Sequence, residues 1–244
     1  VLVHNKMLKS IDLSNNQIGK EGGEAIAKAL SINSVLTSVN LSYNELEAEA
    51  GKALGKALRA NTKLTNLEIA YIKLGSDAAK EIADALQVNK VLTNIDLEGN
   101  KLGLEGGKAI AETLKVSKVL TSIDLTENNL RSEGAKAIAD ALGVNVALKI
   151  IKLGNNQIGT KGGKAIADAL RVNTVLTEVN LHNNSIRPDG GVEIAKALTV
   201  NTVLTNINLS FNKLTGVDYF GKPTAGEYDA SGIKALLSAI SVNT

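Results

Sequence analysis

Four acidic side chains have the chemistry to hold a cation if the fold brings them together. They are Asp96, Glu98, Asp124 and Glu127, and Asp96 lies 28 residues before Asp124. Clustered carboxylates are the ligands that Ca²⁺ prefers, and many calcium sites draw them from one dedicated loop. No such loop surrounds these residues, so a plain acidic surface is the alternative. The elements that position the four residues decide between the two.

Other reactive groups are scarce. The chain has no cysteine, which removes thiol nucleophiles, thiolate metal sites and disulfides. It contains neither glycine-rich nucleotide-binding motif (G-x-x-x-x-G-K-[ST] or G-x-G-x-x-G) and no H-E-x-x-H zinc motif. The only histidines are His4 and His182. We therefore expect no catalytic site, no cofactor and no resident metal.

A leucine recurs every 28 residues along most of the chain. These leucines are Leu8, Leu36, Leu64, Leu92, Leu120, Leu148, Leu176 and Leu204. Each opens the pattern L-x-x-(L/I/V)-x-(L/I), whose alternation predicts a short strand. Small and apolar residues then recur at i, i+3, i+4 and i+7, which is one face of a helix. Since no unit can bury its apolar face alone, we expect a stacked solenoid with a concave parallel sheet and convex helices. His4 and His182 then lie too far apart to share a metal, and His182 is expected on the inner sheet face as an ordinary polar residue.

Two recurring asparagines punctuate most of the units. The first follows the strand and is expected to form a ladder that satisfies buried turn groups. The ladder residues are Asn16, Asn44, Asn100, Asn128, Asn156, Asn184 and Asn212. The third unit has Ile72 at this position, so we expect a locally altered turn there. The second asparagine, as at Asn33, follows the helix, and we expect it to end the helix in the left-handed conformation.

These motifs resemble the ribonuclease-inhibitor class of leucine-rich repeats, whose unit of about 28 residues contains a strand and a full helix. The stretch NTVLTEVNLHNNSIRPDGGVEIAKALTVN, residues 173–201, is especially similar to the leucine-rich domains of NOD-like receptors. Ran GTPase-activating protein and the actin-binding tropomodulins share the class. The resemblance implies an α/β horseshoe over residues 1–244 as one domain. It implies little about function, because the recurring residues are structural.

The strand positions that point away from the core predict an acidic concave surface. Taken over all eight units, these positions hold seven acidic residues and one basic residue, Lys152, in a chain whose net charge is +2. The acids are Asp12, Glu68, Asp96, Glu98, Asp124, Glu127 and Glu178. We interpret this as attraction for a basic partner, and a sheet that is merely polar is the alternative.

The six aromatic residues also avoid the core positions. Tyr43, Tyr71 and Phe211 share one repeat position, directly before the ladder residue, on the edge of the concave face. Tyr219, Phe220 and Tyr228 all lie in an insertion, residues 215–231, where 20 residues rather than six separate Asn212 from Gly232. The insertion is either a tolerated surface loop or a binding loop on the rim. Aromatic residues favour protein interfaces.

Several further features limit the class of protein. No apolar run is long enough to span a bilayer, and the charge is too small to suggest nucleic acid. Three N-x-S sequences, at Asn40, Asn183 and Asn208, fall on or beside predicted strands, where a glycan would block an ordered surface. We therefore expect a cytoplasmic, intracellular protein, and we expect the chain to be part of a longer one.

The sequence as a whole favours a non-catalytic domain that binds a protein on its concave face and rim loop. Two alternatives remain open. One is a regulator of a nucleotide-binding partner, of the GTPase-activating type. The other is a structural scaffold component of a large assembly. The identity of the partner and the oligomeric state are not predicted.

Overall fold

The computed structural model describes residues 5–217, 221–222 and 228–242, and these form eight short strands that alternate with eight helices. The strands are β1 (Ser10–Asp12), β2 (Ser38–Asn40), β3 (Asn66–Glu68), β4 (Asn94–Asp96), β5 (Ser122–Asp124), β6 (Ile150–Lys152), β7 (Glu178–Asn180) and β8 (Asn206–Asn208). The helices are α1 (Lys20–Ile32), α2 (Glu47–Ala60), α3 (Gly75–Val88), α4 (Gly103–Val116), α5 (Arg131–Leu142), α6 (Gly159–Val172), α7 (Arg187–Leu198) and α8 (Ser231–Val242).

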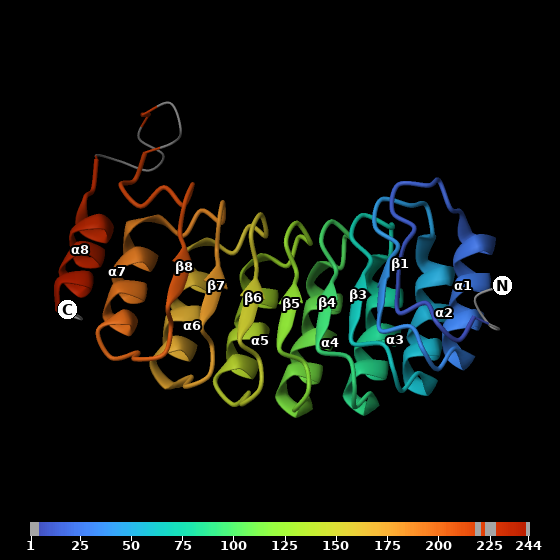
Figure 1. The fold of residues 1–244 in the computed structure, drawn as a ribbon. Helices are drawn as coiled ribbons and strands as arrows, with labels where there is room; N and C mark the ends of the chain where they lie inside the picture. Colours follow the sequence, from blue (N-terminus) through green and yellow to red (C-terminus); the bar gives the residue numbers. More distant parts are fainter. Residues whose placement is uncertain (1–4, 218–220, 223–227, 243–244) are drawn as a thin grey trace.

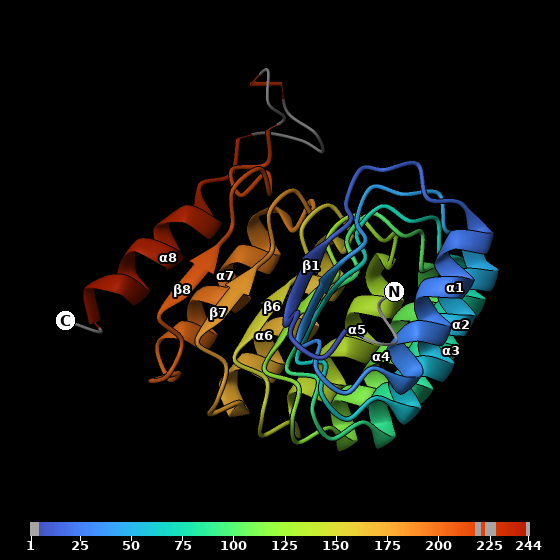
Figure 2. The ribbon, with the colours of Figure 1, turned by 45° about the vertical axis from the view of Figure 1, so that its right-hand side comes forward.

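The strands form one open sheet in sequence order, and every neighbouring pair is parallel. The register repeats the sequence period, since Ser10 pairs with Ser38 and Asn66 pairs with Asn94. The sheet lines the inside of a curve and the helices lie outside it (Figures 1 and 2). Helices pack 8–10 Å apart and strands about 4.8 Å apart, so the stack must bend toward its strands. The predicted horseshoe solenoid is confirmed.

The core lies between the sheet and the helices and consists almost entirely of aliphatic side chains. Its leucines recur at the same positions in successive units, and Leu36, Leu41 and Leu64 are no more than 1% exposed. A solenoid built this way places one residue of each strand in the core and its neighbours on the concave surface. Val39 and Leu67 are buried in the centres of β2 and β3 on that principle.

The first asparagine series forms hydrogen bonds along the turns that follow the strands, in every unit except the third, where Ile72 replaces the asparagine. At Asn128, Nδ2 donates to the Leu97 carbonyl at 2.9 Å, in the preceding unit. Oδ1 of Asn128 accepts from the N–H groups of Asn100 and Leu102, at 3.1 and 3.3 Å. The Asn128 side chain therefore connects two units through groups that burial would otherwise leave unpaired.

The prediction of an altered turn at Ile72 is wrong. Ile72 is fully buried, and its carbonyl accepts from Glu47 N–H at 3.0 Å, as the Asn100 carbonyl accepts from Gly75 N–H. Tyr71 has the same positive φ, 52°, as its equivalents. The neighbouring units on both sides hold the turn in place, so one missing amide does not change its path.

The prediction that the asparagines after the helices adopt the left-handed conformation is also wrong. Asn61 has φ −73° and ψ 129°, which is extended backbone. Its side chain instead forms a second ladder. Nδ2 donates to the Leu30 carbonyl at 2.7 Å, and Oδ1 accepts from Leu64 N–H at 2.7 Å. The asparagine is needed here for its amide rather than for its backbone preference.

None of the helices in the described part of the chain has the length and apolar character needed to cross a membrane.

Candidate functional site

The candidate site lies on the concave sheet and on the edge where the carboxyl ends of the strands meet the turns. The residue directly before each ladder position has a left-handed backbone with φ between 50° and 67°. This row comprises Asn15, Tyr43, Tyr71, Gly99, Glu127, Asn155, Asn183 and Phe211. We call this edge the rim. Its repeated backbone conformation gives successive side chains one orientation, so they form a row across the strands.

Two tyrosines stack at the N-terminal half of the rim. The rings of Tyr43 and Tyr71 are 5.0 Å apart between centroids and inclined by 12°. The Tyr71 hydroxyl donates to Glu127 Oε2 at 2.7 Å, two units further along. Glu127 accepts this bond, and burial of the phenol adds to the effect, so the pKa of Tyr71 is raised well above its usual value. Tyr71 is thus fixed across three units, while Tyr43 remains 57% exposed.

The ring of Tyr71 covers the position of Gly99. A Cβ atom built on Gly99 would lie 2.4 Å from Cδ1 of the Tyr71 ring, and Gly99 has φ +67°. Glycine therefore suits this position for two reasons: it leaves space for the ring, and it adopts the left-handed backbone at no steric cost. The sequence alone did not predict this contact. Its only signal was a glycine in a row that otherwise carries larger side chains.

Next to Tyr71, whose hydroxyl lies 3.4 Å from Glu98 Oε1, is a group of three carboxylates, which we call the acidic cluster: Asp96, Glu98 and Asp124. One carboxylate oxygen of each lies within 4.8 Å of the others. Burial raises the pKa of Asp96 and of Glu98, and the neighbouring negative charges raise both further. The fold therefore holds these negative charges together against their repulsion.

The acidic cluster already has one cationic neighbour. Lys152 Nζ lies 3.0 Å from Asp124 Oδ2, and this contact raises the pKa of the lysine. A calcium ion needs six to eight oxygen ligands, while the cluster offers three side chains, one of them engaged by an ammonium group. Glu127, the fourth residue considered from the sequence, bonds to Tyr71 instead. The geometry suits an acidic surface better than a metal site.

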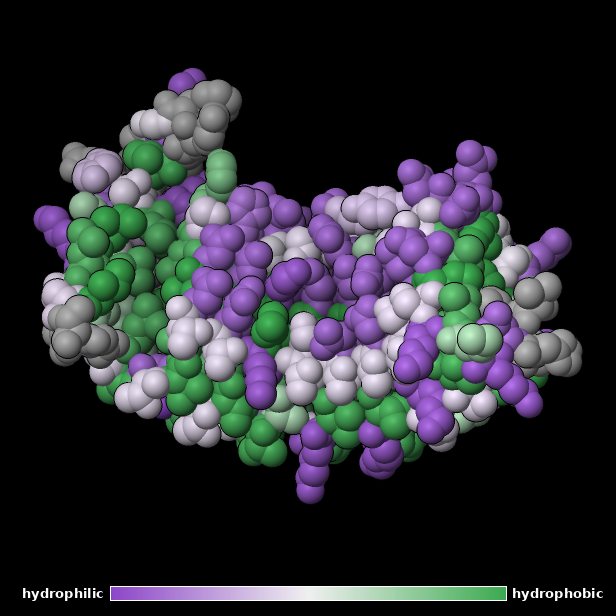
Figure 3. Space-filling model, in the orientation of Figure 1, coloured by the Kyte–Doolittle hydropathy of each residue, from purple (hydrophilic) through white to green (hydrophobic). Residues whose placement is uncertain are grey.

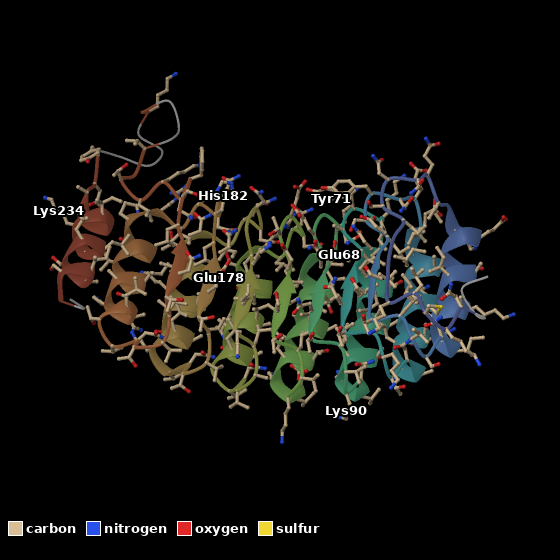
Figure 4. All side chains as sticks on the ribbon, in the orientation of Figure 1. Glu68, Tyr71, Lys90, Glu178, His182 and Lys234 are labelled. Carbon is tan, nitrogen blue, oxygen red and sulfur yellow. The ribbon has the colours of Figure 1, made fainter. Side chains whose placement is uncertain are left out.

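Glu68 extends the acidic surface by one strand. It lies opposite Asp96 in the register of β3 and β4, and Asp96 lies opposite Asp124. Three neighbouring strands thus present acids side by side, before Lys152 follows in β6. Figure 4 labels Glu68 and Tyr71 on this part of the molecule, and Figure 3 shows hydrophilic residues gathered across the concave middle.

A separate aromatic pair lies at the C-terminal end of the rim. The rings of His182 and Phe211 are 5.1 Å apart and meet edge to face at 75°. His182 Nδ1 is 2.8 Å from Ser210 Oγ, and Phe211 is 59% exposed. His182, predicted from the sequence as a polar residue without a special role, contacts the Phe211 ring.

The insertion, residues 215–231, follows this pair in the sequence. Tyr228 is 66% exposed, whereas Tyr219 and Phe220 lie outside the described residues. Helix α8 packs closely on α7 after the insertion. A Cβ atom built on Gly232 would lie 3.0 Å from the carbonyl oxygen of Pro188 in α7. The insertion therefore leaves the packing of the last helix unchanged.

Between the two aromatic groups the rim is lined by amides. Asn183 Nδ2 donates to Asn155 Oδ1 at 2.6 Å, and Gln157 Nε2 donates to Asn129 Oδ1 at 3.2 Å. These four side chains, with Glu127 and Ser185, surround an open hollow of about 440 Å³. The sequence did not predict that the four amide side chains form a site, although three of them are asparagines at two repeated positions.

Comparison with known proteins identifies the repeat. The family model described as "Leucine Rich repeat" matches residues 4–27, 33–55, 88–111, 116–139, 144–167 and 172–195. The chain belongs to the leucine-rich repeat family. No curated protein matches its sequence.

Two solved structures are similar to this leucine-rich repeat domain. One is described as "Leiomodin-1 Actin-Binding Site 2", with 20% identity and a TM-score of 0.42, and the match covers 80% of this chain and 88% of that one. The other is the leucine-rich repeat-containing protein LegL7 from Legionella pneumophila, with 20% identity and a TM-score of 0.46, over 95% of this chain and 91% of that one. At these identities the likeness concerns the fold alone.

Proposed function

We propose that this chain is a non-catalytic domain that binds a basic protein on its concave face and rim. Leucine-rich repeat domains are generally protein-interaction modules. The observation that carries the proposal is the acidic cluster, flanked by Glu68 and by the fixed Tyr71–Glu127 pair. A cationic partner would relieve the repulsion that the fold imposes there, which gives binding a source of free energy and of electrostatic steering.

The rim residues support the same proposal. Tyr43, Tyr71 and Phe211 hold left-handed backbone conformations, which cost a residue other than glycine or asparagine about 1 kcal/mol. The equivalent residues Asn15, Asn155 and Asn183 show that a more tolerant residue fits the same turn. Strained, exposed aromatics on a rigid scaffold are typical of contact residues. We assign Tyr43 and Phe211 as anchors, with Tyr219, Phe220 and Tyr228 as further candidates.

Three finer assignments belong to this proposal. The regular helices of 12 to 14 residues support membership of the ribonuclease-inhibitor class, with the NOD-like receptor domains as the nearest type. The N-x-S sequences support an intracellular location, because Asn40 and Asn208 belong to the ordered sheet. Their Oδ1 atoms accept hydrogen bonds from the N–H groups of Ser42 and Ser210. A glycan at either site would cover the concave sheet. We also propose that the partner is not a nucleic acid.

The test compares two matched variants. Asp96→Asn removes a charge from the acidic cluster, and Asp12→Asn makes the same change at the same strand position in β1. Asparagine occupies this position naturally at Asn40, Asn180 and Asn208, where it accepts the same turn bond, so both variants should fold. Partners retained by the immobilised chain at low salt are identified by mass spectrometry, and their affinities are then measured.

We expect Asp96→Asn to weaken retention of basic partners, and Asp12→Asn, outside the acidic cluster, to weaken it much less. The convex-face variant Lys164→Glu, on α6, serves as a second control. If Lys164→Glu disrupts binding while Asp96→Asn binds normally, the partner occupies the helical side and the proposal is wrong.

A further inference from the structure

The amide-lined hollow of the rim lies between two sites of different character. The acidic cluster and Glu127 lie on its β4–β5 side, and the His182–Phe211 pair lies on its β8 side. Figure 4 labels Tyr71 and His182 on opposite sides of this stretch, and Figure 3 shows the hydrophilic surface between them. A ligand that lies along the rim therefore meets charge, then amides, then an aromatic ring.

The amides are arranged to bind groups that need both a donor and an acceptor. Within each bonded pair one donor and one acceptor are used. In the part of the chain that the structure describes, no bond is made by the opposite groups, Asn155 Nδ2 and Asn183 Oδ1. The left-handed backbone at Asn129, Asn155, Gln157 and Asn183 fixes where these side chains start.

Main-chain peptide groups match this arrangement best. An extended chain exposes N–H and C=O groups that have no internal partner, whereas a helix satisfies its own. Amide side chains supply both complementary groups at neutral charge. Each unit contributes one residue to the rim row, so the rim is a narrow line across the strands rather than a broad surface. These features favour an extended segment over the surface of a folded domain.

The distance between the two ends sets a spacing in the ligand. Three strand intervals separate Glu127 from Phe211, which is roughly 14 Å at about 4.8 Å per interval. An extended chain advances about 3.3 Å per residue, so about four residues cover this distance. The charges of the rim set where the basic residue of the ligand lies. The acids lie at the Glu127 end, whereas Lys213 follows Phe211 at the other end.

We infer that the rim hollow binds the main chain of an extended peptide segment that carries a basic residue about four positions from a large apolar residue. This inference rests on the proposed function and names the chemical form of its partner. The basic side chain lies over Glu127 and the acidic cluster. The apolar side chain lies against Phe211, and the rim amides bind the backbone between them.

Synthetic peptides test the spacing. The probes are blocked, fluorescein-labelled decapeptides of glycine and serine with one arginine and one phenylalanine, separated by two, four, six or eight positions and made in both orders. Fluorescence polarisation measures their binding to the full chain. We expect the separation of four, in one of the two orders, to bind at least about five-fold more tightly than the others. Equal affinity at all separations, or no binding by any peptide, overturns the inference.

N-methylation tests recognition of the main chain. Methylating the backbone nitrogens between the arginine and the phenylalanine removes their donors. We expect a loss of about five-fold for each hydrogen bond removed. The double variant Asn155→Gly with Asn183→Gly should bind the plain peptide more weakly and lose its sensitivity to methylation. Glycine suits the backbone of these positions, as Gly99 shows, and Asn15→Gly, outside the hollow, is the matched control.

The outcomes separate this inference from the proposed function. If methylation has no effect while Asp96→Asn still weakens a captured protein partner, the inference is wrong and the proposed function stands. If Asp96→Asn and the rim variants leave both peptide and protein binding unchanged, both are wrong.

Discussion

At the scale of single residues, the concave surface carries side chains that the repeat itself does not require. Tyr71 contacts three units through its ring and hydroxyl, and Asp96 lies between two other acids in the sheet register. Both residues lie at positions where other units of the same chain have asparagine. The chain thus supplies its own reference residues for testing what these two contribute.

Replacing Gly99 with alanine should destabilise the fold. The new methyl group would meet the Tyr71 ring at 2.4 Å while the backbone keeps φ +67°. We expect the free energy of unfolding, measured with urea, to fall by about 2–4 kcal/mol. In a Tyr71→Asn background the same change should cost only about 1 kcal/mol, the backbone part. An equal cost in both backgrounds would show that the ring moves away freely.

Asp96→Asn should stabilise the folded chain at pH 7 and lose this advantage in acid. Burial raises the pKa of Asp96 in the folded state above its usual 3.8, so the charged form disfavours folding at neutral pH. As pH falls through the raised folded pKa and below the unfolded one, the native carboxyl is protonated and the difference vanishes. We expect about 0.5 kcal/mol in urea denaturation at pH 7, from relief of cross-strand repulsion. A variant less stable than the native chain at pH 7 would contradict this.

At the scale of the strand, turn and helix, the asparagine ladders decide whether each turn can be buried. The first ladder continues through every unit except the third, and the second follows the helices. In both, one amide bonds groups in two units, as Asn128 and Asn61 do. The elements are too short to be stable alone, so these bonds couple each unit to the next.

Asn128→Ala should lower stability by roughly 1–3 kcal/mol for the buried groups it leaves unpaired. The side chain is fully buried and its amide bonds Asn100 N–H, Leu102 N–H and the Leu97 carbonyl. Thermal denaturation followed by circular dichroism measures the loss. The exposed strand residue Asn206, changed to alanine, is the control, and a similar loss in both variants would argue against a special role for the ladder.

Ile72→Asn should be neutral or stabilising. The third turn keeps the ladder geometry, and Ile72 offers no acceptor to the N–H groups of Asn44 and Leu46, which an asparagine would reach. These gains offset the apolar burial that is lost. The melting temperature of the variant tests this prediction, since a clear decrease would show that this turn depends on packing around the isoleucine.

At the scale of the whole molecule, curvature lets one partner contact several units at once. The acidic and aromatic parts of the site come from units far apart in sequence, from β2 to β8 (Figures 1 and 2). Steering by the acids acts over about 10 Å at 0.1 M salt, whereas an aromatic anchor acts by direct contact. The two parts should therefore respond differently to salt.

Phe211→Asn should weaken partner binding by about 2 kcal/mol or more if Phe211 is a hot spot, with little change in salt dependence. Asparagine suits the left-handed backbone at this position, as at Asn183. Removing acidic charges should instead slow association and flatten the salt dependence. Surface plasmon resonance at several salt concentrations separates the two effects. Val200→Ala, an exposed apolar residue after α7, is the control, and a salt-dependent defect in Phe211→Asn would contradict the assignment.

The sequence by itself determined the architecture, because a strict 28-residue period leaves one way to bury the apolar face of each unit. It also located the ladder and placed Glu68, Asp96 and Asp124 on one face, since strand positions alternate between core and surface. Tertiary structure alone decided how side chains from different units combine. The Tyr71–Glu127 bond crosses 56 residues, and the contact with Gly99 and the amide pairs of the rim depend on backbone direction in the turns. Periodicity fixes which residues share a surface, but rotamers and turn conformations fix which of them touch.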